Sequence, residues 1–187
     1  MIVLIIKVRE EDFDINCPSL SQKCFEPLIK IYKVRMSEDT NIGVKERFYE
    51  ELSEGQRALF MFHVYYNHIS KSLIEFYWWN AYFMAQPKSW AALKACFKYL
   101  NDESFLSLLE KIEQQLKRHN HPTTLENFSI TRDELNQNKE LQASFESLYD
   151  IFENINPVTI AKINTTIKKI YKNLYKLKIK EYFLWQL

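Results

Sequence analysis

The sequence predicts an all-α fold, and three observations carry this prediction. The 187 residues include only two glycines, and because Gly supplies the positive-φ positions of tight hairpin turns, a β-rich architecture is poorly supported. Hydrophobic residues make up 47% and charged residues 26% of the chain, as in globular proteins. Apolar residues also recur at steps of three and four, the period of an α-helix. We therefore expect a multi-helix bundle of about seven helices.

The N-terminal part combines a short apolar start with two weaker helical patterns. Ile2 to Val8 is apolar and β-branched, which predicts a short extended segment. It has no basic residues before it and no small-residue cleavage site after it, so a signal peptide is not expected. Pro27 suits the first turn of a helix that continues through Leu28 and Ile31. Val44 to Leu52 predicts a second, shorter helix.

An aromatic-rich stretch follows and is expected to form the centre of the fold. Ser53 and Gln56 fit the capping box, in which the two side chains satisfy N–H groups at the start of a helix. The apolar run that begins there ends at a predicted turn over His68–Ser72. A second apolar helix runs from Leu73 to Ala85 and is stopped by Pro87. Helices that are apolar almost all round are buried.

The remaining chain divides at a polar loop. Residues 89–100 and 103–117 are predicted helices, and residues 119–131 are the best candidate for a long loop. We expect one domain overall, with an aromatic-rich helical body over residues 1–118 and a C-terminal helical hairpin over residues 132–187 packed on it.

The antiparallel hairpin is predicted from two apolar seams that flank Asn156 and Pro157. Every facing pair has the same sum of residue numbers, as an antiparallel register requires. The pairs are Ile155 with Ile160, Phe152 with Ile163, Leu148 with Ile167, Phe145 with Ile170, and Leu141 with Leu174. The same register sets Glu153 against Lys162 and Glu146 against Lys169.

Charge is unevenly distributed although the net charge is only +1. Residues 101–154 carry 5 Lys and Arg against 11 Asp and Glu, whereas residues 155–187 carry 7 against 1. We expect the two helices of the hairpin to neutralise each other. The alternative is a basic face that binds nucleic acid or an anionic surface. Its members would be Lys162, Lys169, Lys172 and Lys176. The apolar tail after Glu181 is expected to fold back onto the body or to enter a homodimer interface together with the C-terminal helix.

Cysteine and histidine placement predicts neither a metal site nor a cofactor. Three cysteines without a C-x-x-C spacing indicate reduced thiols in a cytoplasmic protein. His63 and His68 are five residues apart and would lie on different faces of a helix, and His119 and His121 fall in the loop. No run approaches the ~20 apolar residues of a membrane span, so no membrane partner is expected. G-x-S-x-G, Walker A and G-x-G-x-x-G motifs are absent.

One short motif suggests an enzyme. Arg57 and His63, with five residues between them, resemble the R-x(4–6)-H motif of the HEPN ribonucleases, which are also all-helical. The resemblance implies that these two residues act together on RNA. Ala58 stands where that family often places a polar residue. The alternative is that Arg57 is a solvated first-turn side chain and His63 a core histidine.

The aromatic helices allow two interpretations. In the first they supply only the core. In the second, Tyr66, Trp79 and Tyr82 line a groove for a partner's side chain, with Glu75 beside them, because Tyr and Trp dominate interface hot spots.

A further resemblance covers residues 52–116. The run from Leu52 to Phe60, followed by Glu75 to Trp79, resembles the helical DNA-mimic-type domain of bacteria, which has a capped helix, a turn, an aromatic helix and then an amphipathic helix. That family usually carries a Gly-Gly-Phe turn where this chain has Ser70 to Leu73. The resemblance implies an all-α interaction module. A net charge of +1 is not the acidic surface that DNA mimicry needs.

These observations predict a non-enzymatic, cytoplasmic protein-binding module, such as an immunity, antitoxin or regulatory factor of a bacterium or phage. The alternatives are an RNase that uses Arg57 and His63, and nucleic-acid binding through the Lys-rich C-terminal helix.

Overall fold

The computed structural model describes the backbone of residues 17–39 and 42–184, and the side chains of residues 17–39 and 43–169. Within these ranges it contains eight α-helices and no strand, which confirms the all-α prediction. The predicted extended segment at residues 2–8 lies outside the described residues. The helices are α1 (Leu20–Glu38), α2 (Ile42–Glu51), α3 (Glu54–Ile69), α4 (Leu73–Met84), α5 (Pro87–Tyr99), α6 (Glu103–Arg118), α7 (Glu134–Gln137) and α8 (Lys139–Leu184), with a short 3-10 helix η2 (Leu125–Asn127).

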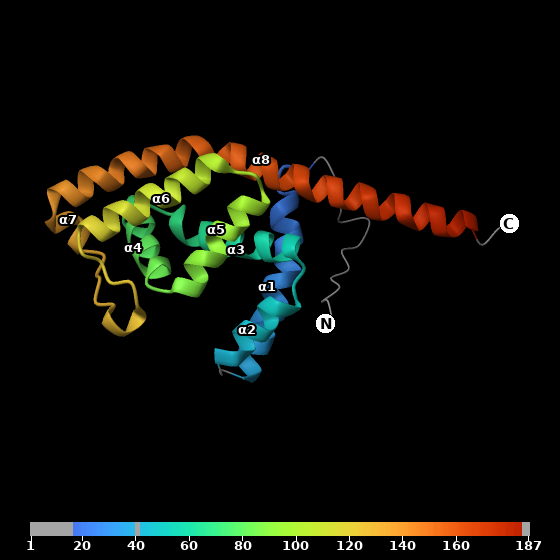
Figure 1. The fold of residues 1–187 in the computed structure, drawn as a ribbon, viewed down its shortest axis with the longest axis horizontal. Coiled ribbons are helices and arrows are strands. Elements are labelled where there is room, and N and C mark those ends of the chain that lie inside the picture. The colour runs from blue at the N-terminus through green and yellow to red at the C-terminus, as the bar shows by residue number, and fades with distance from the viewer. Residues whose placement is uncertain (1–16, 40–41, 185–187) are drawn as a thin grey trace.

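Helix α3 lies at the centre of the bundle, where it packs against α1, α4 and α5. Helix α8 runs along one side of the body over α6, and its C-terminal part extends past α1 (Figure 1). Between α6 and α7 the chain forms a loop that contains only η2, in agreement with the loop predicted at residues 119–131.

Local sequence signals fix the start of α3 and α4. The Ser53 hydroxyl accepts a hydrogen bond from the Gln56 N–H at 3.3 Å, and the Gln56 side-chain oxygen accepts one from the Ser53 N–H at 2.9 Å, so the predicted capping box is confirmed. Ser72 caps α4 with a single bond, since its hydroxyl accepts from the Glu75 N–H at 3.2 Å. Pro87 ends the apolar run of α4, as predicted, and occupies the first turn of α5.

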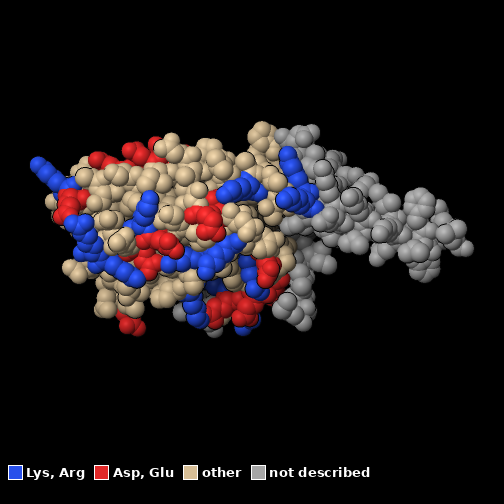
Figure 2. All heavy atoms as spheres, turned by 45° about the horizontal axis from the view of Figure 1, so that its top comes forward, with Lys and Arg blue, Asp and Glu red and all other residues tan. Residues whose placement is uncertain are grey.

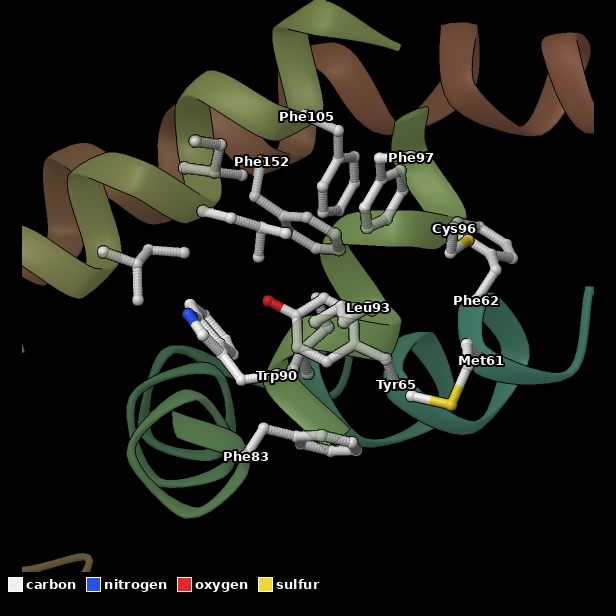
Figure 3. Packing of buried hydrophobic residues seen from close by; sticks show 14 of the residues in the cluster. Met61, Phe62, Tyr65, Phe83, Trp90, Leu93, Cys96, Phe97, Phe105 and Phe152 are labelled. Carbon is white, nitrogen blue, oxygen red and sulfur yellow. The ribbon is translucent and has the colours of Figure 1, made fainter. Parts of the chain in front are cut away.

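Aromatic side chains from α3, α5, α6 and α8 meet in the core (Figure 3). Phe97 stacks on Phe105 with ring centroids 3.9 Å apart, and Phe152 meets Phe105 edge-on. The fully buried Tyr65 hydroxyl donates to the Asn80 side-chain oxygen at 2.5 Å, so its polar group is satisfied inside the core. The aromatic stretch therefore forms much of the core, through Phe60, Phe62, Tyr65, Phe76, Tyr77, Phe83 and Trp90.

The predicted C-terminal hairpin is wrong, because α8 is one continuous helix of 46 residues. Pro157 lies inside this helix instead of in a turn. Packing explains the difference: the apolar seam of the first half is already buried, and Phe145, for example, meets Tyr77 of α4 edge-on at 5.0 Å. In a hairpin, the second half of α8 would have to pack on the apolar face of the first half. That face is covered by α4 and α6, so α8 continues along α1 instead. The buried seam residues are Leu141, Phe145, Leu148 and Phe152.

The charge pairs predicted from the hairpin are wrong as well. Lys162 pairs with Asp102, which precedes α6, at 2.8 Å rather than with Glu153. Glu146 and Lys169 lie far apart on the same helix. The acidic and basic halves follow one another along one axis and do not neutralise each other face to face.

Helix α1 also differs from the prediction, because Pro27 lies inside it and not in its first turn. The helix begins before Pro27 because Leu20 and Phe25, which precede this proline, are both buried in the core. Its N-cap residue, Ser19, makes no side-chain capping bond. Asn164 of α8 takes this role: its side-chain oxygen accepts from the Ser21 N–H at 3.0 Å, and its side-chain nitrogen donates to a carbonyl just before the helix.

Candidate functional site

Helix α4 has one face in the core and one aromatic face at the surface of the bundle. Glu75, Trp78, Trp79 and Tyr82 are all half-buried and follow one another at i, i+3, i+4 and i+7, the spacing of one helix stripe. We call these four residues the outer face of α4. The opposite face is buried and consists of Phe76, Tyr77, Asn80, Ala81, Phe83 and Met84.

Trp78 is enclosed by side chains from two parts of the chain. Its ring stacks on Tyr82, with centroids 5.1 Å apart and planes 10° from parallel. The Arg132 guanidinium lies 4.2 Å from the centroid of the Trp78 ring, a cation–π arrangement. Phe128 meets both Trp78 and Tyr82 edge-on. The indole N–H of Trp78 donates to the Ile130 carbonyl at 2.9 Å, so its only polar group is satisfied.

Trp79 is held separately on the same face. Its indole N–H donates to Glu75 at 2.8 Å, and its ring stacks on His68 of α3 with centroids 3.6 Å apart. Burial and the nearby Lys71 lower the pKa of His68, although Glu75 acts in the opposite direction. A neutral imidazole therefore lies against the indole at pH 7.

Glu75 connects the two tryptophans to the loop before α7. Its carboxylate accepts two hydrogen bonds from Arg132, at 2.5 Å from Nε and 3.0 Å from the second guanidinium nitrogen. This bidentate geometry, together with the Trp79 N–H, lowers the pKa of Glu75. The Arg132 side chain remains 44% exposed, so the ion pair faces solvent on one side. The arrangement is a rigid aromatic surface with a paired charge at one end.

The structure brings together three of the four predicted groove residues: Glu75, Trp79 and Tyr82. Tyr66 is not among them, because it points from α3 toward α8, stacks on Phe62 at 5.4 Å and accepts from the Asn156 side chain at 3.5 Å. The prediction also missed five contributors. Trp78 could have been found from the stripe spacing, but no local signal links α4 to the others, which are His68, Phe128, Ile130 and Arg132.

Arg57 and His63, the predicted ribonuclease pair, have different structural surroundings. Arg57 donates to the carbonyls of Tyr49 at 2.9 Å and Glu50 at 2.8 Å, so it binds the C-terminal end of α2. His63 is 4% exposed and stacks on Phe25 of α1 with centroids 4.9 Å apart, with neither ring nitrogen hydrogen-bonded. Burial lowers the pKa of His63 to about 4, and an interaction with the Ser21 backbone offsets only part of this effect.

The lysines of the predicted nucleic-acid face are only partly described. Lys162 is engaged by Asp102, as above, and Lys169 is exposed. The side chains of Lys172 and Lys176 lie outside the described residues. On the face drawn in Figure 2, basic and acidic side chains are intermingled.

The described residues lack two other kinds of site. Among them, no three His, Cys, Asp or Glu side chains are grouped so that they could hold a metal ion. None of the helices in the described part of the chain combines the length and apolarity that a membrane crossing requires.

Comparisons with known proteins identify no relative of this chain. No protein-family model matches the chain, and no curated protein or solved structure is significantly similar to it. The resemblance of residues 52–116 to the DNA-mimic-type domain therefore stays a prediction.

Proposed function

We propose that this chain is a non-enzymatic protein-binding module whose contact surface is the outer face of α4. The observation that carries the proposal is the half-buried set of Trp78, Trp79 and Tyr82, whose rings are fixed by stacking and by indole hydrogen bonds within the protein. Trp, Tyr and Arg are the residue types that dominate interface hot spots. Because Trp79 is already ordered by His68 and Glu75, a partner would lose little conformational entropy by docking on it.

A module of this kind fits the role of an immunity, antitoxin or regulatory factor of a bacterium or phage, acting in the cytoplasm. Such factors work by occupying another protein and need a preformed surface rather than reactive groups. This assignment rests on analogy of size and architecture. Arg57 and His63 supply no comparable support for the ribonuclease alternative, because each is used in packing between helices.

Comparative affinity capture tests the proposal. The tagged full chain, Trp79→Ala and Tyr82→Ala are used as baits in an extract of the source cells, with Tyr99→Ala as the matched control. Tyr99 is an aromatic residue on α5 that is 37% exposed. We expect quantitative mass spectrometry to show a partner retained by wild type and Tyr99→Ala and lost with both α4 variants. Identical recovery with all four folded baits, or no reproducible partner, would contradict the proposal.

A second candidate function is nucleic-acid binding through the C-terminal part of α8. The observation in its favour is the continuity of α8 as far as Leu184, because a single helix does not fold its basic C-terminal part back on the acidic residues 133–153 as a hairpin would. Lys162 is unsuited to this role while it pairs with Asp102. The discriminating experiment is an electrophoretic mobility assay with RNA and DNA at low salt. The triple change of Lys169, Lys172 and Lys176 to Gln should reduce both binding and its salt dependence.

A further inference from the structure

An extended segment of the loop before α7 lies across the outer face of α4. We call residues 128–132 the strap. Phe128, Ile130 and Arg132 contact α4, whereas the intervening Ser129 and Thr131 are exposed. The alternation from Phe128 to Thr131 is that of an extended chain, and Arg132, which is itself exposed, lies in the turn that precedes α7. The five residues of the strap span about 13 Å at 3.3 Å per residue, and the stripe on α4 spans about 10 Å at 1.5 Å per residue.

The two ends of the loop are anchored in the core, while the strap itself is attached at the surface. At one end His121 is buried and hydrogen-bonded to the Tyr77 hydroxyl at 2.8 Å. At the other end Leu135 is completely buried. Between these anchors, a single hydrogen bond from the Trp78 indole to the Ile130 carbonyl joins the strap backbone to α4 among the described contacts. Neither anchor is a residue of the strap, so release of the strap from α4 would leave both anchors in place.

The contacts of the strap are those by which a peptide would be recognised. Glu75 receives a guanidinium fork, the Trp78 ring receives the same cation on its face, and the Trp78 N–H binds a backbone carbonyl two residues before the arginine. An aromatic ring four residues before the arginine fits against Trp78 and Tyr82. Each of these interactions depends on chemistry that another protein chain can supply.

We propose that the strap is an internal stand-in for a partner, and that the outer face of α4 binds an extended protein segment of the pattern aromatic-x-aliphatic-x-Arg that displaces it. This proposal rests on the proposed function and names its partner class. A partner that displaces the strap makes the same kinds of contact with α4 as the strap does. Because the strap is tethered and has a high effective concentration, the partner needs an additional contact to compete with it. Trp79, which stacks on His68 and not on the strap, offers that contact.

The test uses a fluorescein-labelled peptide with the sequence of residues 126–133 and measures its anisotropy with the full-length protein. In wild type the tethered strap occupies the site and the apparent affinity is reduced accordingly. Phe128→Ala with Arg132→Gln frees the site, and we expect about tenfold tighter peptide binding than to wild type. Ser129→Ala is the matched control in the same segment and should behave as wild type. A peptide with its arginine replaced by alanine should not bind.

Equal binding of the peptide to wild type and to the double variant, or no binding to either, would overturn the proposal. Far-UV circular dichroism verifies the fold, and the single variant Arg132→Gln replaces the double variant if the latter does not fold. The outcome is separable from that of the proposed function. If Trp79→Ala loses a captured partner while the peptide shows no preference, the strap proposal fails and the protein-binding function stands.

Discussion

The Lys162 ammonium lies 2.8 Å from a carboxylate oxygen of Asp102 whose side chain is only 2% exposed. The other carboxylate oxygen accepts a hydrogen bond from the Thr159 hydroxyl at 2.6 Å. Asp102 stands at the N-cap of α6 but makes no side-chain capping bond there. Its charge instead holds α8 immediately after Pro157, the position at which the helix would be most easily interrupted.

Lys162→Met should lower the free energy of unfolding by about 3 kcal/mol, because it leaves a buried carboxylate without its counter-charge. Lys169→Met, on the exposed side of the same helix, is the control and should change stability by less than about 0.5 kcal/mol. Urea denaturation followed by circular dichroism measures both. Equal stabilities of the two variants would show that the Asp102 pair does not hold α8.

Pro157→Ala should stabilise the protein by about 1–3 kcal/mol, because an interior proline removes a helix hydrogen bond and clashes with the preceding turn. Pro157 is exposed, so the substitution leaves no cavity. The measurement is the urea midpoint, with helical ellipticity as a check. A loss of stability would contradict the continuous helix, since a turn at this position would benefit from proline.

Stability should fall in mild acid because of His63. Its pKa is lowered from 6.5 to about 4 by burial. The folded state therefore binds the proton more weakly than the unfolded state. The contribution of His63 to the free energy of unfolding is fully present above pH 6.5 and is lost as the pH falls toward 4. The full loss for this group is roughly 3 kcal/mol.

His63→Leu should remove this contribution. Because the pKa values of His68 and His121 are also lowered, wild type and variant both lose stability in acid, and the informative quantity is the difference between them. Urea midpoints at pH 7 and pH 4 should show a smaller loss for His63→Leu. Parallel losses in the two proteins would mean that His63 does not titrate as a buried neutral group.

Arg57→Ala should destabilise the protein by about 1–2 kcal/mol, because two carbonyls at the end of α2 lose their charged donor. Thermal unfolding measures this loss, and Arg47→Ala, which changes an arginine of α2 that is 66% exposed, is the control and should have little effect. RNA incubated with purified wild type and Arg57→Ala provides a second readout. Cleavage by wild type alone would favour the ribonuclease alternative instead.

Local patterns predicted the elements that depend on local interactions. The capping box at Ser53 and Gln56 placed the start of α3, and the apolar steps of α6 are all buried as predicted. The hairpin failed because a seam of three- and four-residue steps has the same period in a hairpin as in one long helix. The long helix is favoured over the hairpin because α4 and α6 cover the apolar face of the first half of α8.

In the candidate site, too, the residues that share one helix could be predicted together, whereas those from other parts of the chain could not. Glu75, Trp79 and Tyr82 were predicted together and lie together because they share one stripe of α4. Tyr66 belongs to another helix and faces α8. Arg132 is 57 positions from Glu75, and only the path of the loop after α6 brings it there.

The bond between Asn164 and the start of α1 has a consequence for the order in which the chain is made. Helix α1 is synthesised well before α8, yet its first turn is capped by a side chain 143 positions later. Until that part of α8 has been synthesised and has docked, the N–H of Ser21 lacks its native acceptor. Helix α1 is therefore expected to remain frayed at its N-terminus in nascent chains that stop before Asn164, and to become fully protected only when α8 closes the bundle.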